Sequence, residues 1–302
     1  MLNNSKLHKL IEEPHLISQL QFSDIAEILK KAREILLEEF LLMHINLHNS
    51  KEMIYVIGDL HGNLESLMRL IEIINKTNPK YVLFLGDLVD RGENQLECLI
   101  LVLILKILNP NQYYVLKGNH ETVEMNQVYG FYYEFLEKFK DPKRFYEVLS
   151  LYQVIPICFI INKTILCLHG GIPEDFDALN KFEGLRVNEI NERVYKTIAN
   201  SIYQILWNDP KEVENLYFSN SFRGPGIKFF GKKAFDNFMK INNLKYLIRA
   251  HECFEEGYRW FFNKRLLSIF SSANYRGYFS PNSASYAIIQ TNMIFPKILK
   301  AL

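Results

Sequence analysis

The spacing of apolar residues changes along this chain. It is helical near the N-terminus, and from residue 53 onward strand-like runs alternate with helical segments. Residues 24–40 place apolar side chains three and four positions apart, which predicts an amphipathic helix, and residues 1–22 predict a shorter helix or an arm. From residue 53 onward, short apolar runs of strand length alternate with segments of helical spacing, a pattern typical of an α/β fold. The predicted strands are 53–57, 81–85 and 113–116, and the predicted helices are 63–76 and 94–108.

The second half of the chain turns to β structure. Residues 122–150 are mostly helical in pattern and rich in aromatic residues, which we interpret as core rather than as a surface for stacking nucleotides. β-branched and aromatic runs separated by turn residues then predict further strands, with a helical insert near 187–207. These strands are expected at 153–159, 164–169, 246–250, 265–270 and 285–290.

We therefore expect an α/β protein (α+β in some schemes) with two sheets packed face to face and helices outside. Residues 1–50 would form N-terminal helices packed on the body, and residues 51–302 the main domain, the two making one globular unit. At 48% hydrophobic residues, the chain of 302 residues can bury a large core.

Three polar loops follow the first three predicted strands. Their sequences are GDLHGN (58–63), GDLVDRG (86–92) and GNHE (118–121). The spacing of 28 residues from Asp59 to Asp87, and of 32 from there to Asn119, is about one βαβ unit per step. The loops should therefore leave adjacent parallel strands at one edge of a sheet, where ligands bind in such folds.

Charge and cysteine content narrow the class of protein. The net charge of +1, from 35 basic and 34 acidic residues, argues against strong binding to nucleic acid or anionic membranes. The four cysteines lie in apolar surroundings without a C-x-x-C pair, which indicates buried free thiols and a cytoplasmic location. No secretory signal is visible, and the longest apolar run, 99–108, is half the ~20 residues of a membrane span and predicts a buried helix.

Half of the eight histidines stand directly after apolar, strand-like runs. These are His61, His120, His169 and His251, each next to Gly, Asp, Asn or Glu. Nitrogen and oxygen donors without thiolate suit Mn, Fe, Zn or Mg, and two such ions about 3.5–4 Å apart can direct a hydroxide at an electrophile. The predicted ligands are Asp59, His61 and Asp87 for one ion, and Asp87, Asn119, His169 and His251 for the other, with Asp87 bridging.

Other side chains in the same loops suggest phosphate chemistry. Arg91 and Arg223 offer planar, bidentate donors suited to phosphoryl oxygens. His120, adjacent to Asn119, is the predicted general acid, and Asp90 would hold and charge its ring so that a proton is available for a leaving alkoxide. The alternative is that Asp90 and Arg91 form a structural ion pair.

Six ordered motifs together resemble the phosphoprotein phosphatase family, the metal-dependent Ser/Thr phosphatases of the calcineurin-like metallophosphoesterase superfamily. The resemblance covers nearly the whole chain, and because little sequence follows the last motif, the chain is most similar to compact archaeal members. The motifs are GDLHGN, GDLVDRGE, LKGNHE, LHGGI, RAHE and FSSANY.

The resemblance implies a metallophosphoesterase fold and the hydrolysis of phosphomonoesters on phosphorylated proteins. The attack would be in-line, by a hydroxide bridging two divalent ions, with Mn²⁺ favoured in vitro and Fe or Zn as alternatives. It also implies the six metal ligands above and the acid pair His120 and Asp90, and it names no regulatory subunit. The implied phosphate contacts are Arg91, Asn119, Arg223 and Tyr275, the last resting on the resemblance alone.

Four departures from the family pattern leave the proposed ligands intact. They are Asn63 for Gln, Lys117 for Arg, Ser272-Ala273 for Ala-Pro, and Arg276 for a frequent Cys. Two other functions remain open. One is cleavage of dinucleoside tetraphosphates or phosphodiesters by an enzyme of the same superfamily, although the DRG and GNHE variants favour phosphomonoesters. The other is an inactive phosphopeptide-binding scaffold, against which the complete ligand set argues.

Overall fold

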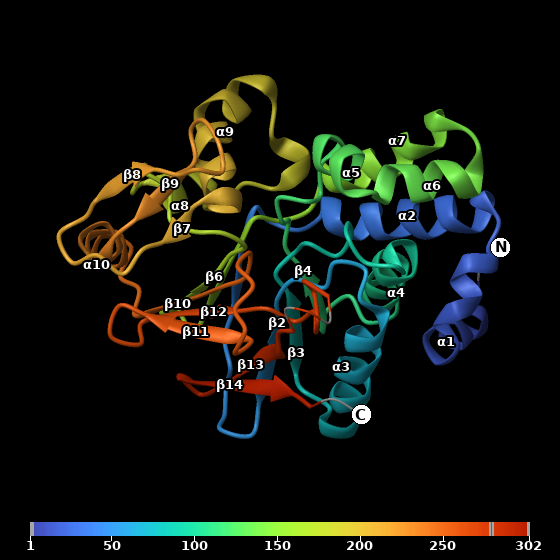
Figure 1. The fold of residues 1–302 in the computed structure, drawn as a ribbon, viewed down its shortest axis with the longest axis horizontal. Helices are drawn as coiled ribbons and strands as arrows, with labels where there is room; N and C mark the ends of the chain where they lie inside the picture. Colours follow the sequence, from blue (N-terminus) through green and yellow to red (C-terminus); the bar gives the residue numbers. More distant parts are fainter. Residues whose placement is uncertain (1–2, 278, 280, 301–302) are drawn as a thin grey trace.

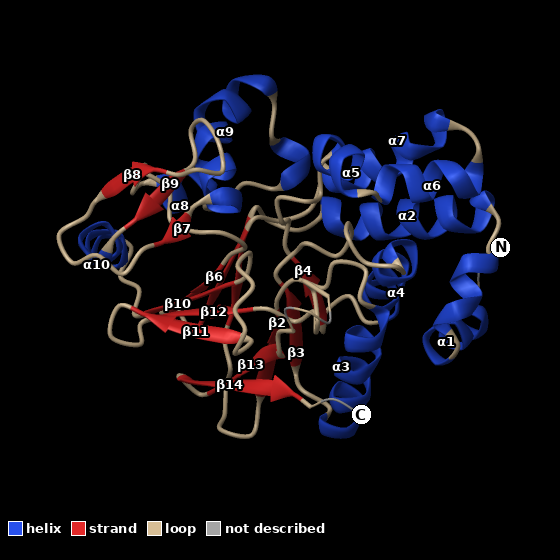
Figure 2. Cartoon of the chain, in the orientation of Figure 1, coloured by secondary structure: helices blue, strands red, loops and turns tan. Residues whose placement is uncertain are grey.

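Two large β-sheets form the centre of the molecule. The computed structural model describes residues 3–277, 279 and 281–300. Helices lie on the outer sides of the sheets (Figures 1 and 2), so the predicted sandwich flanked by helices is confirmed. The five-stranded sheet has the order β14 (Met293–Leu299), β13 (Ala284–Gln290), β2 (Met53–Ile57), β3 (Tyr81–Phe84) and β4 (Tyr113–Val115). The six-stranded sheet has the order β1 (Leu42–Ile45), β5 (Cys158–Ile161), β6 (Ile165–Cys167), β10 (Tyr246–Arg249), β12 (Leu266–Ile269) and β11 (Tyr258–Phe261).

The first three predicted strands form the expected parallel unit. β2, β3 and β4 pair in parallel, with Val56 opposite Leu83 and Leu83 opposite Tyr114. Helices α3 (Leu64–Thr77) and α4 (Gln95–Leu108) make the two crossovers. Because the three strands run in the same direction, the three polar loops leave the sheet at one edge, as predicted.

The second sheet differs from the prediction in three places, the first of which is β11 (Tyr258–Phe261), a strand that was not predicted. Leu42–Ile45, expected in the N-terminal helical segment, form β1, which pairs in parallel with β5. The N-terminal segment is thus not purely helical, whereas the proposed division at residue 50 stays a prediction. The strand expected at 153–159 begins only at Cys158. Val154 and Ile155 are buried in an irregular segment after α7 (Tyr146–Tyr152), so their apolar character reflects burial and not a strand.

Aliphatic side chains from both sheets fill the interior of the sandwich. Ile54 and Leu83 from the five-stranded sheet lie in one cluster with Ile248 and Leu267 from the six-stranded sheet. On the outer face of the five-stranded sheet, a second cluster includes α1 (Asn4–Glu12), α2 (Phe22–Leu37), α3 and α4. The short helix η1 (Pro14–Gln19) also contributes to this cluster through Ile17.

Helix α4 is buried on nearly every side, which explains its long apolar run. Lys106 within this run is fully buried, and its Nζ pairs with the Glu39 carboxylate and donates to the Pro110 carbonyl (2.8 Å). Burial lowers the pKa of Lys106 and raises the pKa of Glu39. The attraction between the two charges acts in the opposite direction on both pKa values and is outweighed. In the described part of the chain, no helix is both long and apolar enough to cross a membrane.

The phenylalanines of the aromatic segment are core, as interpreted from the sequence. Phe135 is 1% exposed, and its ring lies 4.7 Å from that of Phe139 and 5.2 Å from that of Phe145. Tyr133 in the same stripe is 58% exposed. The segment contains α5 (Val123–Tyr129), α6 (Phe131–Phe139) and η2 (Pro142–Phe145), followed by α7.

A small third sheet was not predicted. Its strands β7 (Asp209–Pro210), β9 (Lys228–Phe230) and β8 (Phe218–Asn220) are too short for a hydrophobic pattern to reveal them. The sheet lies beside three helices whose apolar faces cover the outer side of the six-stranded sheet (Figure 1). These helices are α8 (Ala178–Phe182), α9 (Glu192–Trp207) and α10 (Lys232–Ile241), with η3 (Val187–Glu189) before α9.

The buried aromatic cluster should contribute strongly to stability. Phe135→Ala should lower the free energy of unfolding by about 3–5 kcal/mol, because it leaves a cavity among packed rings. Tyr133→Ala, on the exposed side of the same helix, should change it by less than about 0.5 kcal/mol. Urea unfolding followed by circular dichroism measures both, and equal effects would show that the stripe is not core.

Candidate metal centre and active site

Hydrogen bonds between the polar loops fix their relative positions. The backbone amides of Leu60 and His61 donate to the carbonyl of Asp87 (3.0 and 2.9 Å). Glu121 joins the second and third loops, because its carboxylate accepts from the amides of Asp87 (2.9 Å), Leu88 (2.9 Å) and Gly118 (2.7 Å). Burial and the nearby Asp87 charge raise the pKa of Glu121 to about 7 against these hydrogen bonds. No role was predicted for Glu121 from the sequence, although this residue ends the GNHE motif.

The backbone is unusual at several of the predicted site residues. Left-handed φ angles are uncommon for residues other than glycine and carry a conformational cost, so surrounding contacts must hold them. Gly86 also has a positive φ (+99°), and a Cβ there would lie 2.2 Å from the Gly118 amide nitrogen, so the second and third loops touch. The site residues with left-handed φ are His61 (46°), Asp87 (52°), Asp90 (71°), Arg91 (75°) and His251 (70°).

The first predicted metal group is arranged around His61. The Nδ1 of His61 lies 2.9 Å from the Val89 carbonyl, so a neutral ring donates there and leaves the lone pair of Nε2 free. That Nε2 faces Oδ2 of Asp59 and Oδ2 of Asp87, at 3.6 Å from each. Within the described residues, Asp59 Oδ2 is buried without a hydrogen-bond partner. Both carboxylates thus face the free lone pair of His61, which fits a cation. The donor atoms that lie within 4.8 Å of one another here belong to His61, Asp87 and His120, so Asp59 stands at the margin of this group.

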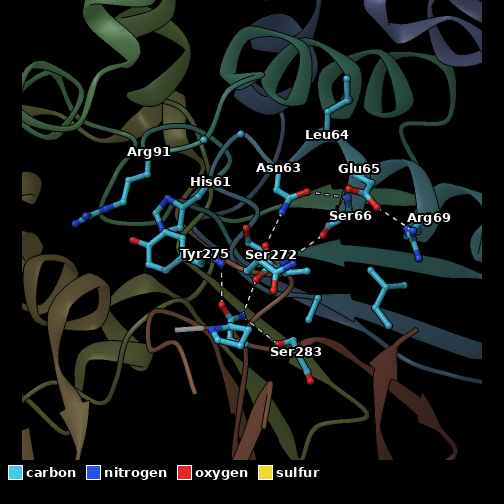
Figure 3. Close-up of a pocket in the computed structure, with 18 of the residues that line it drawn as sticks. His61, Asn63, Leu64, Glu65, Ser66, Arg69, Arg91, Ser272, Tyr275 and Ser283 are labelled. Atoms are coloured by element: carbon cyan, nitrogen blue, oxygen red, sulfur yellow. Dashed lines mark hydrogen bonds and ion pairs between the residues drawn. The ribbon is translucent and has the colours of Figure 1, made fainter. Parts of the chain in front are cut away.

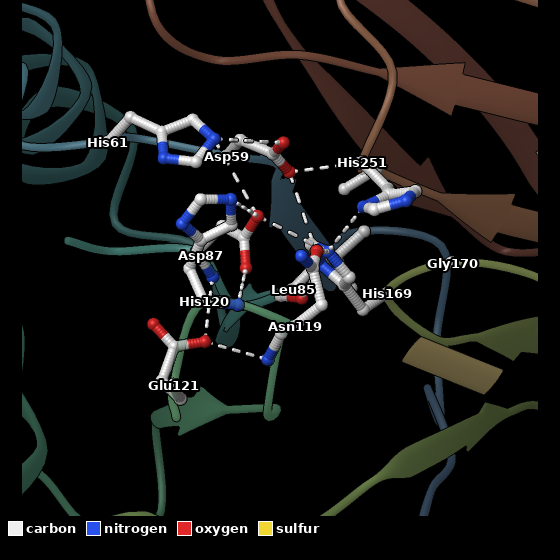
Figure 4. A network of polar contacts seen from close by, with 12 residues as sticks. Asp59, His61, Leu85, Asp87, Asn119, His120, Glu121, His169, Gly170 and His251 are labelled. Atoms are coloured by element: carbon white, nitrogen blue, oxygen red, sulfur yellow. Dashed lines mark hydrogen bonds and ion pairs between the residues drawn. The ribbon is translucent and has the colours of Figure 1, made fainter. Parts of the chain in front are cut away.

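The second group repeats this arrangement (Figure 4). The Nδ1 of His169 lies 2.9 Å from the Leu85 carbonyl, so the lone pair of Nε2 points away from it. Around His169 Nε2 lie three more acceptor atoms: Asn119 Oδ1 (2.9 Å), His251 Nδ1 (3.2 Å) and Asp87 Oδ2 (3.4 Å). Because Asp87 faces both groups, the nitrogen, carboxylate and amide donors fit two divalent ions with Asp87 between them.

The carboxylates attract positive charge into the site. Burial disfavours a charged imidazole, but the Asp87 carboxylate outweighs it and raises the pKa of His169 to about 9. The pKa of His61 is raised for the same reason, by Asp59 and Asp87 against burial. Although burial opposes it, the neighbouring histidines hold the pKa of Asp87 well below its usual range. A bound metal ion would replace this protonation.

His120 and Asp90 form the pair expected of an oriented general acid. His120 Nδ1 lies 2.7 Å from Oδ2 of Asp90, which is fully buried. Asp90 also accepts from Asn126 Nδ2 (2.9 Å) and the Phe131 amide (3.1 Å), partners that were not identified from the sequence. The other ring nitrogen of His120, Nε2, lies 3.9 Å from Oδ2 of Asp87.

Arg91 does not make the alternative ion pair with Asp90 within the described residues. Its guanidinium instead lies 3.9 Å from the centre of the Tyr129 ring and 5.6 Å from that of Tyr275. Tyr275 in turn stacks on His61, with ring centres 4.9 Å apart and an interplanar angle of 24°. Arg91 and Tyr275 therefore stand at the edge of the first metal group. Arg223 lies on the side of the second group, where its Nε donates to Asp209 Oδ2 (2.5 Å).

A cleft of about 860 Å³ runs from His61, Arg91 and Tyr275 along α3 to Arg69 (Figure 3). Asn63, one of the departures from the family pattern, lines this cleft and bonds to two segments of its wall. Its Oδ1 accepts from the Ser66 amide at the start of α3 (2.9 Å), and its Nδ2 donates to the Ala273 carbonyl (2.9 Å). The shorter side chain thus connects α3 to the loop that carries Tyr275.

Known proteins resemble this chain in sequence and in structure. Residues 53–254 match the family of calcineurin-like phosphoesterases. Over 256 residues the chain is 33% identical to a serine/threonine-protein phosphatase 4 catalytic subunit from Candida glabrata, covering 85% of this chain and 80% of that protein.

Solved structures agree with this match. A protein serine/threonine phosphatase from Saccharomyces cerevisiae, described as similar to human phosphatase PP5, has a TM-score of 0.80 at 26% identity, covering 94% of this chain and 91% of that chain. A cold-active protein-tyrosine phosphatase from Shewanella shares the fold, with a TM-score of 0.61 at 15% identity, covering 88% and 84%.

Fold, site and matches define the class as calcineurin-like metallophosphoesterases. Within this class, the chain belongs to the phosphoprotein phosphatase family of Ser/Thr phosphatase catalytic subunits. The resemblance seen in the motifs is thereby confirmed.

Metal affinity should fall with decreasing pH. In the metal-free protein the pKa of His169 is about 9, so its ring is protonated at neutral pH and must lose that proton to offer Nε2. If each bound ion displaces one proton, affinity should fall about tenfold per pH unit between about pH 8.5 and 6.5. Calorimetric titration with Mn²⁺ in buffers of different ionisation enthalpy measures affinity and proton release together. An affinity that is independent of pH in this range would contradict the assignment.

Proposed function

We propose that this chain is a protein serine/threonine phosphatase that uses two divalent metal ions and His120 as general acid. The observation that carries the proposal is the convergence of buried acceptor atoms on both sides of Asp87, beside a histidine oriented by a buried carboxylate. The proposed metal ligands are Asp59, His61, Asp87, Asn119, His169 and His251.

Each group of site residues has a separate proposed role in the hydrolysis. Two divalent cations, when bound, would neutralise phosphate charge and make hydroxide available at neutral pH. His120 would give the proton on Nε2 to the leaving alkoxide, and Asp90 would hold Nδ1–H and stabilise the charged ring. Arg91, Arg223, Asn119 and Tyr275 would bind the phosphoryl oxygens, the arginines as planar forks. Mn²⁺ is the proposed metal in vitro, with Fe or Zn as alternatives.

We further propose phosphorylated proteins as substrates and the cytoplasm as the location. The cleft beyond Tyr275 is lined by both polar and apolar side chains, which suits a polypeptide segment on one side of a phosphorylated residue. The four cysteines are free thiols, three of them buried, which supports a reducing compartment.

Substrate comparison tests the reaction class. The Mn²⁺-loaded protein should hydrolyse a phosphoserine peptide at least about tenfold faster, by kcat/KM, than a dinucleoside tetraphosphate at equal concentration, because a phosphomonoester presents three oxygens to the arginines. Phosphate release measures both reactions. Faster cleavage of the nucleotide would overturn the proposal in favour of a phosphoanhydride hydrolase, and the absence of both activities would favour a binding scaffold.

The general acid can be tested by the choice of leaving group. His120→Gln should lower kcat for a phosphoserine peptide by at least about 100-fold, the scale of acid–base catalysis. The loss should be smaller for p-nitrophenyl phosphate, whose leaving group needs no proton. His44→Gln is the matched control, because His44 is exposed and pairs with Glu183 far along the chain. Equal losses on both substrates would assign His120 another role.

A further inference from the structure

A further buried carboxylate, that of Asp209, lies beside the candidate metal centre. It is 1% exposed and stands at the start of β7, in the small sheet that carries the Arg223 loop. Its Oδ2 accepts from Arg223 Nε (2.5 Å), and its Oδ1 accepts from Arg249 Nη2 (2.9 Å). The same Oδ1 lies 4.0 Å from Nε2 of His251. One carboxylate therefore faces a predicted phosphate ligand and a predicted metal ligand.

His251 presents the nitrogen that such a carboxylate would serve. Its Nδ1 faces the second metal group, so the ring would bind metal through Nδ1 and carry its proton on Nε2. That Nε2 is buried and has no hydrogen-bond partner among the described residues. Histidine ligands usually donate their other ring nitrogen to a carboxylate or carbonyl. A small ring rotation or one bridging water would connect His251 Nε2 with Asp209 Oδ1.

Arg249 keeps the Asp209 carboxylate from turning away. Its side chain is fully buried, and its nitrogens also bond to the Gly170 carbonyl (2.5 Å) and Glu252 (2.9 Å). Arg249 thus holds one side of the Asp209 carboxylate. On the other side, Asp209 accepts from Nε of Arg223, which leaves Nη1 and Nη2 of Arg223 available for a phosphate. A carboxylate held this firmly can orient both neighbours.

We propose that Asp209 is a positioning residue that orients Arg223 toward the phosphate and His251 toward the second metal ion. The inference rests on the proposed function, because it assigns a partner to two of the residues used there. It differs from a purely structural role, in which Asp209 only neutralises the buried charge of Arg249. A structural role affects stability, whereas the positioning role also changes phosphate and metal affinity.

Asp209→Asn keeps the shape of the side chain and removes its charge. Calorimetric titration of the metal-free protein with Mn²⁺ should show one of two equivalents weakened 10- to 100-fold, the usual cost of losing such a partner. In the Mn²⁺-loaded enzyme, the inhibition constant of inorganic phosphate should rise about tenfold. The control is Asp236→Asn, an Asp on α10 that pairs with Lys232 and Arg265, and it should change neither value.

Arg223→Gln separates the two effects. It should raise the phosphate inhibition constant and leave both metal equivalents within about twofold of wild type. Adding Asp209→Asn should not raise the phosphate constant further, because both changes remove the same oriented arginine. The added change should still weaken one metal equivalent. If Asp209→Asn does not fold, Asp209→Glu keeps the charge beside Arg249 and should show both defects in smaller measure.

The outcomes distinguish this inference from the proposed function. Wild-type protein that fails to bind two equivalents of Mn²⁺ would contradict the proposed function itself. Wild-type binding of two equivalents, with metal and phosphate affinities unchanged in a folded Asp209 variant, would overturn only the role of Asp209.

Discussion

The rest of the structure depends on the burial of the Asp87 carboxylate between two groups of acceptor atoms. This side chain is 1% exposed, and its Oδ2 faces the ring nitrogens of His61 and His169. A buried charge is strongly unfavourable unless opposite charge compensates it. The protein holds it by the Glu121 contacts, by left-handed backbone at the ligands, and by glycines where the loops touch. The arrangement is satisfied only when positive charge occupies the site.

The site lies between the two sheets and needs both of them. The loops after β2, β3 and β4 supply Asp59, Asp87 and Asn119, whereas His169 and His251 follow β6 and β10 of the other sheet. The backbone amide of His251 donates to Asp59 Oδ1 (3.0 Å), a direct bond between the two halves. The aliphatic interior fixes the distance between the sheets, and because close-packed interiors deform little, it also fixes the distance between the proposed ligands.

The outer layers bring the proposed phosphate ligands to this centre. The α5–α6 segment supplies Tyr129, over which Arg91 stacks, and the Phe131 amide that holds Asp90. The small sheet on the opposite side carries Arg223. Arg91 and Arg223, the two proposed phosphate ligands of this kind, therefore lie beside the same centre although they come from two separate layers.

The sequence by itself determined the βαβαβ unit and the two-sheet architecture, and it indicated which residues are candidate metal ligands. It could do so because strand runs and polar loops are local patterns, and because parallel strands must deliver their ends to one edge. The tertiary structure alone decided that Leu42–Ile45 join the second sheet, that a third sheet exists, and that Arg91 stacks on Tyr129 instead of pairing with Asp90. Short strands carry too little pattern, and the direction of a side chain depends on neighbours distant in sequence. For the same reason, Glu121, Asn126 and Asp209 gained their roles only when the loops were brought together in space.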